Sequence, residues 1–110
     1  MKKLFIIGLD CAEPSLVFDE FKDELPNLRF LYENGLSGRL YSTIPPITIP
    51  AWMVMATGKD PGQLGLYGFR HRKAYSYTEI WIANSLKVEE PTVWDLLGER
   101  GAKSIIVGVP

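Results

Sequence analysis

The sequence has few of the features that point to secretion, to a membrane or to nucleic acid. Its single cysteine, Cys11, cannot form a disulfide within the chain, so no oxidising compartment is indicated. The apolar run of residues 4–9 ends at Asp10 and is too short for a secretory leader or a membrane span. The net charge of −1 gives no electrostatic reason to expect a nucleic-acid or membrane partner. We therefore expect a soluble cytoplasmic protein.

Short apolar runs rich in β-forming residues predict the sheet. Residues 4–9 and residues 104–109 are continuous apolar runs of the kind that form strands buried on both faces. Residues 38–42 are expected to form a further strand. A strand, several helices and a matching strand favour a right-handed crossover. The sequence thus predicts an α/β fold, with a mostly parallel sheet and helices on both faces.

Proline and glycine mark the expected helices between these strands. One helix begins near Pro14, and a second has Pro26 in its first turn and stops at residues 34–35. Residues 91–97 predict a later helix. Residues 58–77 are rich in turn signals and are expected to be loop-like. Residues 79–82 fit either a short strand or a packed loop.

Residues 43–52 are a proline-rich approach to another helix. Two consecutive prolines are expected to hold the approach extended. Thr48 stands where an N-cap belongs, and Pro50 falls in the first turn, where its missing N–H costs nothing. The helix is expected to continue to Thr57 and to stop at Gly58. Its N-terminal N–H groups, that of Ile49 in particular, favour an anion such as phosphate.

The Thr48 hydroxyl has two interpretations, an ordinary cap or a nucleophile. Taken alone, it is better read as a cap. Asp10 follows the first predicted strand, at the sheet edge where ligands gather in α/β folds. Its carboxylate is equally suited to capping a turn or to binding a divalent metal ion. A metal beside Thr48 would activate the hydroxyl, so the pairing with Asp10 strengthens the nucleophile hypothesis.

At this point the sequence resembles the alkaline phosphatase superfamily, and within it the type I phosphodiesterase/nucleotide pyrophosphatase group and its predicted phosphohydrolase relatives. The matching motifs are Gly8-Leu9-Asp10, residues 46–52, 56–62, 91–97 and 107–110. The resemblance implies an α/β metalloenzyme with two divalent ions, usually zinc, with manganese or magnesium as alternatives. Such enzymes hydrolyse phosphate mono- or diesters through a covalent phospho-enzyme. By motif match, Asp10 is a metal ligand, and Thr48 is the nucleophile and a ligand of the same ion.

The resemblance also implies that this chain is one portion of a catalytic domain. The family's other ligands are aspartates and histidines in its later part, whereas this sequence has one histidine, His71. Residues 1–110 are therefore expected to be the N-terminal portion of a single alkaline-phosphatase-like domain, incomplete at the C-terminus and inactive alone. Its unfinished sheet is expected to self-associate.

The sequence departs from the family pattern at positions that bear on the substrate. Phe69 stands where diesterases carry a phosphate-holding asparagine, and Leu64 where a histidine is frequent. Whether the enzyme is a monoesterase or a diesterase thus stays open. Cys11 stands where relatives often have glycine, and we expect it to be a small buried hydrophobe rather than part of the site.

A basic stretch adds a weaker candidate. Arg70 and Arg72 are predicted to bind an anionic group of a phosphate-ester substrate, although such clusters are more often solvated surface. Tyrosines 67, 75 and 77 could stack on a base or sugar, or simply pack the loop. The alternatives are a cofactor-independent phosphomutase-like enzyme of the same superfamily and a non-catalytic α/β domain. A sulfatase is disfavoured because it requires cysteine or serine at the position of Thr48.

Overall fold

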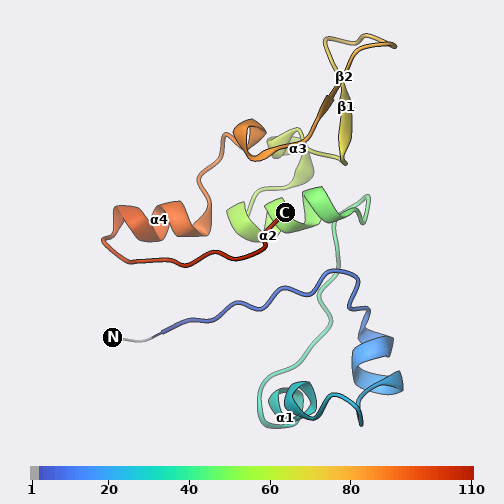
Figure 1. Ribbon diagram of the computed structural model, residues 1–110, viewed down its shortest axis with the longest axis vertical. Coiled ribbons are helices and arrows are strands. Elements are labelled where there is room, and N and C mark those ends of the chain that lie inside the picture. Colours follow the sequence, from blue (N-terminus) through green and yellow to red (C-terminus); the bar gives the residue numbers. More distant parts are fainter. Residues whose placement is uncertain (1–2) are drawn as a thin grey trace. The chain divides into compact units, whose positions relative to one another are not determined.

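The computed structural model describes residues 3–110 (Figure 1). Contacts along the chain divide it into two units, Met1–Tyr41 and Ser42–Pro110, and each is described by itself. The first unit contains an extended N-terminal segment and two helical segments. The second contains the remaining helices and a β-hairpin.

The helices expected in the first unit are confirmed. The segment η1 (Leu16–Glu20) has π-helical geometry, and helix α1 spans Pro26–Asn34 with proline in its first turn. The ring of Phe18 in η1 lies 5.3 Å from the ring of Tyr32 in α1, measured between centroids. This aromatic contact joins the two helical segments. Most other residues of the first unit are exposed to solvent.

Helix α2 (Thr48–Thr57) carries most of the core of the second unit. The predicted stop is confirmed, since Gly58 has a φ of 70° and its N–H donates to the carbonyl of Val54. The predicted N-cap is wrong by one residue. Ile47 is the extended residue that precedes the helix, with φ −120° and ψ 144°, and Thr48 is the first residue inside it.

Residues 58–77 are more ordered than the turn signals suggested. Helix α3 (Pro61–Leu64) is held by a capping box, in which Asp60 accepts from the Gln63 N–H at 2.8 Å and the Gln63 side chain accepts from the Asp60 N–H at 3.2 Å. Strand β1 (Arg70–Arg72) follows it. The loop-like expectation is wrong for residues 61–64 and 70–72 and holds for the rest of this stretch. The spacing between Asp60 and Gln63 is itself a helix-start signal.

Strand β1 pairs with strand β2 (Ile80–Ile82) in an antiparallel two-stranded hairpin. This confirms the strand alternative for residues 79–82. In the register, His71 lies opposite Trp81, and Arg70 and Arg72 lie opposite Ile82 and Ile80. Since successive side chains of a strand alternate between faces, one face carries His71 and Trp81 and the other carries the two arginines.

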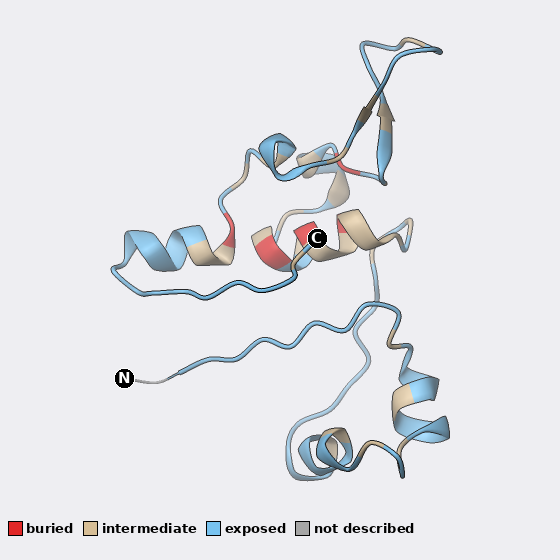
Figure 2. Ribbon diagram, viewed as in Figure 1, coloured by how far each residue is buried: buried red, intermediate tan, exposed pale blue. Residues whose placement is uncertain are grey.

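The rest of the second unit consists of the 3-10 turn η2 (Ser85–Lys87) and helix α4 (Val93–Glu99). Helix α4 confirms the helix expected around residues 91–97. Three of the buried positions are on α2 and two lie beyond it, and Figure 2 colours them red: Pro50, Met53, Ala56, Leu66 and Thr92. The core of this unit is therefore small and centred on α2.

The mostly parallel sheet predicted from the sequence is not found among residues 3–110. Residues 4–9, 38–42 and 104–109 are not strands, and the sheet in the described part of the chain is the antiparallel hairpin. Their apolar side chains, expected to be buried on both faces, are open to solvent: Phe5 is 83% exposed and Ile105 is 94% exposed. A strand requires a hydrogen-bonded neighbour, and a short apolar run does not specify which segment that neighbour is. The α/β character of the prediction stands, and its sheet topology does not.

Candidate active site

The start of helix α2 places Thr48 at a defined position. The first intrahelical hydrogen bond runs from the Ala51 N–H to the carbonyl oxygen of Ile47 at 3.1 Å. Thr48 thus has helical backbone geometry and a half-buried side chain. The residue at the cap is isoleucine, which has no side-chain acceptor. The structure therefore does not support the interpretation of Thr48 as an ordinary N-cap.

The approach to the helix is held by short-range hydrogen bonds. The Thr43 hydroxyl donates to the carbonyl of Pro45 at 2.8 Å, and the Ile47 N–H donates to the same oxygen at 3.0 Å. The Ile44–Pro45 peptide bond in this approach is cis. The Pro45 carbonyl is thus the common acceptor that shapes the loop before Thr48.

The first turn of α2 is suited to an anion. Ile49 is the second residue of the helix, and its N–H precedes the first intrahelical hydrogen bond. Pro50 has no N–H and is almost fully buried, so it anchors the turn without adding a donor. The positive end of the helix dipole and the Ile49 N–H together favour negative charge beside Thr48.

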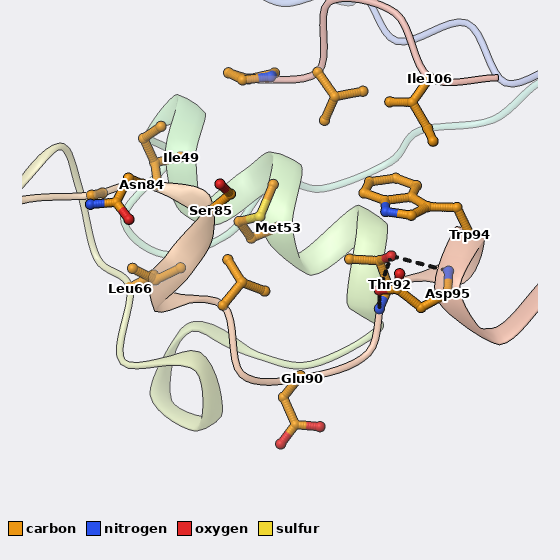
Figure 3. Close-up of a pocket in the computed structure, with 14 residues that line it drawn as sticks. Ile49, Met53, Leu66, Asn84, Ser85, Glu90, Thr92, Trp94, Asp95 and Ile106 are labelled. Carbon is orange, nitrogen blue, oxygen red and sulfur yellow. Dashed lines mark hydrogen bonds between the residues drawn. The ribbon is translucent and has the colours of Figure 1, made fainter. Parts of the chain in front are cut away.

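A mainly apolar pocket of about 360 Å³ lies along α2 (Figure 3). Ile49 and Met53 of the helix line it, together with Leu66, Trp94 and Ile106. Three of its polar side chains take part in local caps. Asn84 accepts from the Leu86 N–H at 3.1 Å, and the Thr92 hydroxyl donates to Asp95 at 2.5 Å. Asn84, Thr92 and Asp95 thus serve the local structure of this pocket wall.

Arg70 and Arg72, which were predicted to bind an anionic group of the substrate, lie on the exposed face of the hairpin. Its base lies near the start of α2, since a Cβ placed on Gly68 would be 3.8 Å from Cδ1 of Ile47. The strands extend away from that end of the helix (Figure 1). Arg72 lies over the ring of Tyr77, 4.7 Å from its centroid. Among the residues that the structure describes, no carboxylate forms an ion pair with Arg70 or Arg72.

Asp10 belongs to the first unit of the chain. It lies in a turn, and its carboxylate accepts from the Cys11 N–H at 3.1 Å. The expectation that Cys11 is buried is wrong. Its side chain is exposed and its φ is 58°, a left-handed geometry that glycine adopts more readily than other residues. The structure thus brings Thr48 and Ile49 together at one helix start, with the arginines on the adjoining hairpin.

The described residues do not by themselves make a metal centre. Across residues 3–110 there is no group of three or more His, Cys, Asp and Glu side chains that could hold an ion. Protein zinc sites use three or four such ligands, so Asp10 and Thr48 are too few for two ions.

Two features of the second unit were missed from the sequence. One is the capping box of α4, which the pattern Thr92-x-x-Asp95 could have revealed. Its hydrogen bonds, first that of the Thr92 hydroxyl and then that of the Thr92 N–H, hold the pKa of Asp95 below its ordinary value of 3.8. The other is His71, which stacks on Trp81 with ring centroids 4.2 Å apart. Only the strand register brings these two rings together.

Comparison with known proteins agrees with the motifs. A family model described as "Type I phosphodiesterase / nucleotide pyrophosphatase" matches residues 4–110. No curated protein and no solved structure gives a significant match. None of the helices in residues 3–110 has the length and apolar character of a membrane span. The matched range covers nearly the whole sequence, and the chain belongs to the type I phosphodiesterase/nucleotide pyrophosphatase family of phosphoesterases.

Proposed function

We propose that this chain carries the nucleophile of a phosphoesterase, and that the nucleophile is the Thr48 hydroxyl. The observation that carries the proposal is the position of Thr48 as the first residue inside α2, directly before the Ile49 N–H. A nucleophile in the first turn has phosphate-binding N–H groups beside it.

The proposed reaction has two displacements. In the first, Oγ1 of Thr48 forms a bond to phosphorus while the bond to the leaving alcohol breaks, and the alcohol takes up a proton. In the second, water attacks the phospho-threonine, the bond between Oγ1 and phosphorus breaks, and Oγ1 regains a proton. Each step exchanges one phosphorus–oxygen bond for another, so no oxidant or further reactant is needed.

The neighbouring groups have supporting roles in this proposal. The Ile49 N–H donates to a phosphoryl oxygen and stabilises the negative charge that grows there during attack. Arg70 and Arg72 bind an anionic part of a small-molecule phosphate ester, a role for which their exposed side chains have no competing ion pair in the described part of the chain.

We further propose that the activity depends on metal ions, zinc or alternatively manganese or magnesium. Asp10 and Thr48 would be among the ligands, and residues outside these 110 would complete the site within a single catalytic domain. The 110-residue chain is then inactive by itself. A cytoplasmic location, and self-association through the exposed apolar segments, belong to the same proposal.

The test replaces Thr48 in the full-length protein. Thr48→Ala should abolish hydrolysis of an aryl phosphate and of a bis-aryl phosphodiester, while Thr48→Ser should retain part of it because serine keeps the hydroxyl. Mass spectrometry of acid-quenched wild-type enzyme should find phosphate on the peptide that contains Thr48. Wild-type rates in Thr48→Ala would overturn the assignment.

A further inference from the structure

The ring of His71 is held firmly within the hairpin. It lies nearly parallel to the ring of Trp81, with centroids 4.2 Å apart and an angle of 14° between the planes. The ammonium group of Lys87 lies 5.5 Å from the centroid of the same Trp81 ring. Both stacked rings are half-buried, whereas Arg70 and Arg72 on the opposite face are exposed. The stack therefore restricts where the imidazole nitrogens of His71 can lie.

One of those nitrogens makes a hydrogen bond to the backbone. Nε2 of His71 lies 3.0 Å from the carbonyl oxygen of Gly68. A carbonyl oxygen can only accept, so Nε2 carries the hydrogen and donates it. The bond ties strand β1 to the segment of residues 65–69 that precedes it.

That segment lies beside the start of helix α2, as two observations show. Leu66 is 1% exposed and lines the pocket with Ile49 and Met53, as Figure 3 shows. Two residues later, a Cβ at Gly68 would lie within ordinary contact distance, 3.8 Å, of Cδ1 of Ile47. Ile47 is the residue whose carbonyl begins the helix. The segment therefore packs against the helix start that carries Thr48.

We infer that His71 is a positioning residue for Thr48. By holding the Gly68 carbonyl, His71 keeps residues 65–69 against Ile47 and so fixes the first turn of α2. The inference rests on the proposed role of Thr48 as nucleophile. In-line attack depends on the placement of the attacking oxygen, and displacements of about 1 Å cost up to about a hundredfold in rate. His71 itself does not touch the substrate.

The test compares variants of the full-length enzyme that separate the stack from the hydrogen bond. His71→Phe and His71→Leu lose the donor, and phenylalanine keeps a ring against Trp81. His71→Gln loses the ring and keeps an N–H donor. Lys73→Gln is the matched control, because Lys73 is exposed on the same hairpin and its nearest ion-pair partner is Glu79, 3.6 Å away.

We expect the donorless variants to lower kcat for a bis-aryl phosphodiester roughly tenfold to a hundredfold with little change in KM. His71→Gln should recover most of the loss, and Lys73→Gln should match wild type. Full kcat in folded His71→Phe, or no recovery in His71→Gln, would overturn the inference. So would failure of both donorless variants to fold while His71→Gln folds, because the bond would then support the fold as a whole.

Thr48→Ala separates this inference from the proposal on which it rests. If Thr48→Ala is inactive and the His71 variants behave like wild type, the nucleophile stands and the positioning role falls. If Thr48→Ala stays active, the nucleophile falls irrespective of His71.

Discussion

The carbonyl oxygen of Ile47 accepts the Ala51 N–H at 3.1 Å, and this bond sets the first residue of α2 at Thr48. The second unit contains a useful contrast at α4, where Thr92 is the N-cap and its hydroxyl takes part in a capping box with Asp95. Two threonines at helix starts thus have different positions relative to the cap. Only Thr92 has the local geometry of a structural cap.

Removal of the Thr92 hydroxyl should destabilise the second unit. We expect Thr92→Ala to lower the free energy of unfolding by about 1 kcal/mol, the usual cost of losing an N-cap side chain. Urea denaturation followed by circular dichroism measures it. Thr78→Ala, at an exposed turn, is the control and should cost less. Equal losses for the two variants would mean that the capping box contributes nothing specific.

The same capping box predicts a pH dependence of stability. Since its hydrogen bonds hold the pKa of Asp95 below 3.8, the folded state favours the carboxylate more than the unfolded state does. The resulting stabilisation is complete above that ordinary value and is lost as the pH falls through the lower, folded-state value. Denaturation curves of wild type and Asp95→Asn should diverge least at acid pH. A constant difference between them at every pH would contradict the prediction.

Two glycines of the second unit should respond differently to alanine. Gly58 has a φ of 70° at the end of α2, so Gly58→Ala should cost about 1 to 2 kcal/mol in unfolding free energy. Gly68 does not have a positive φ, and its added Cβ would make an ordinary contact with Ile47. Gly68→Ala should therefore change stability by less than about 0.5 kcal/mol. The reverse order of costs would be inconsistent with this backbone geometry.

Metal binding by the 110-residue chain should be weak. Because residues 3–110 hold no cluster of three or more ligands, calorimetric titration with zinc should show no tight pair of sites. Asp10→Asn is the control and should give a similar titration curve. Tight binding of two zinc ions by the chain alone would refute the proposal that further ligands complete the site.

The exposed apolar segments should make the isolated chain self-associate. Ile105 is 94% exposed and Val107 is 85% exposed. Both lie in an apolar segment that has strand-forming residues but is not part of a strand. Light scattering should show species larger than a monomer at high concentration, and Ile105→Lys should reduce them. Lys103→Gln, in the same segment, should leave them unchanged. A monomer at all concentrations would be the contrary result.

Local signals predicted the elements that depend on few residues. Proline at the start and glycine past the end gave correct bounds for α1, and a glycine in left-handed geometry ends α2 as expected. The family motifs around Thr48 also lie within single segments of the sequence. The signals were less reliable at the start of α2, where Ile47 caps the helix and Thr48 does not. A threonine next to a helix resembles a cap in sequence whether or not it is one.

The sequence by itself determined the approximate positions of η1, α1, α2 and α4 and the family, because each depends on residues close together in the chain. It left residues 79–82 open between a strand and a packed loop. Only the tertiary structure decided that His71 reaches Gly68 and that Gly68 lies beside Ile47. It also decided that residues 4–9 and 104–109 are not strands within the described chain. Such contacts depend on strand pairing and on packing between distant segments, and hydrophobic pattern indicates that a residue needs a partner without specifying which one.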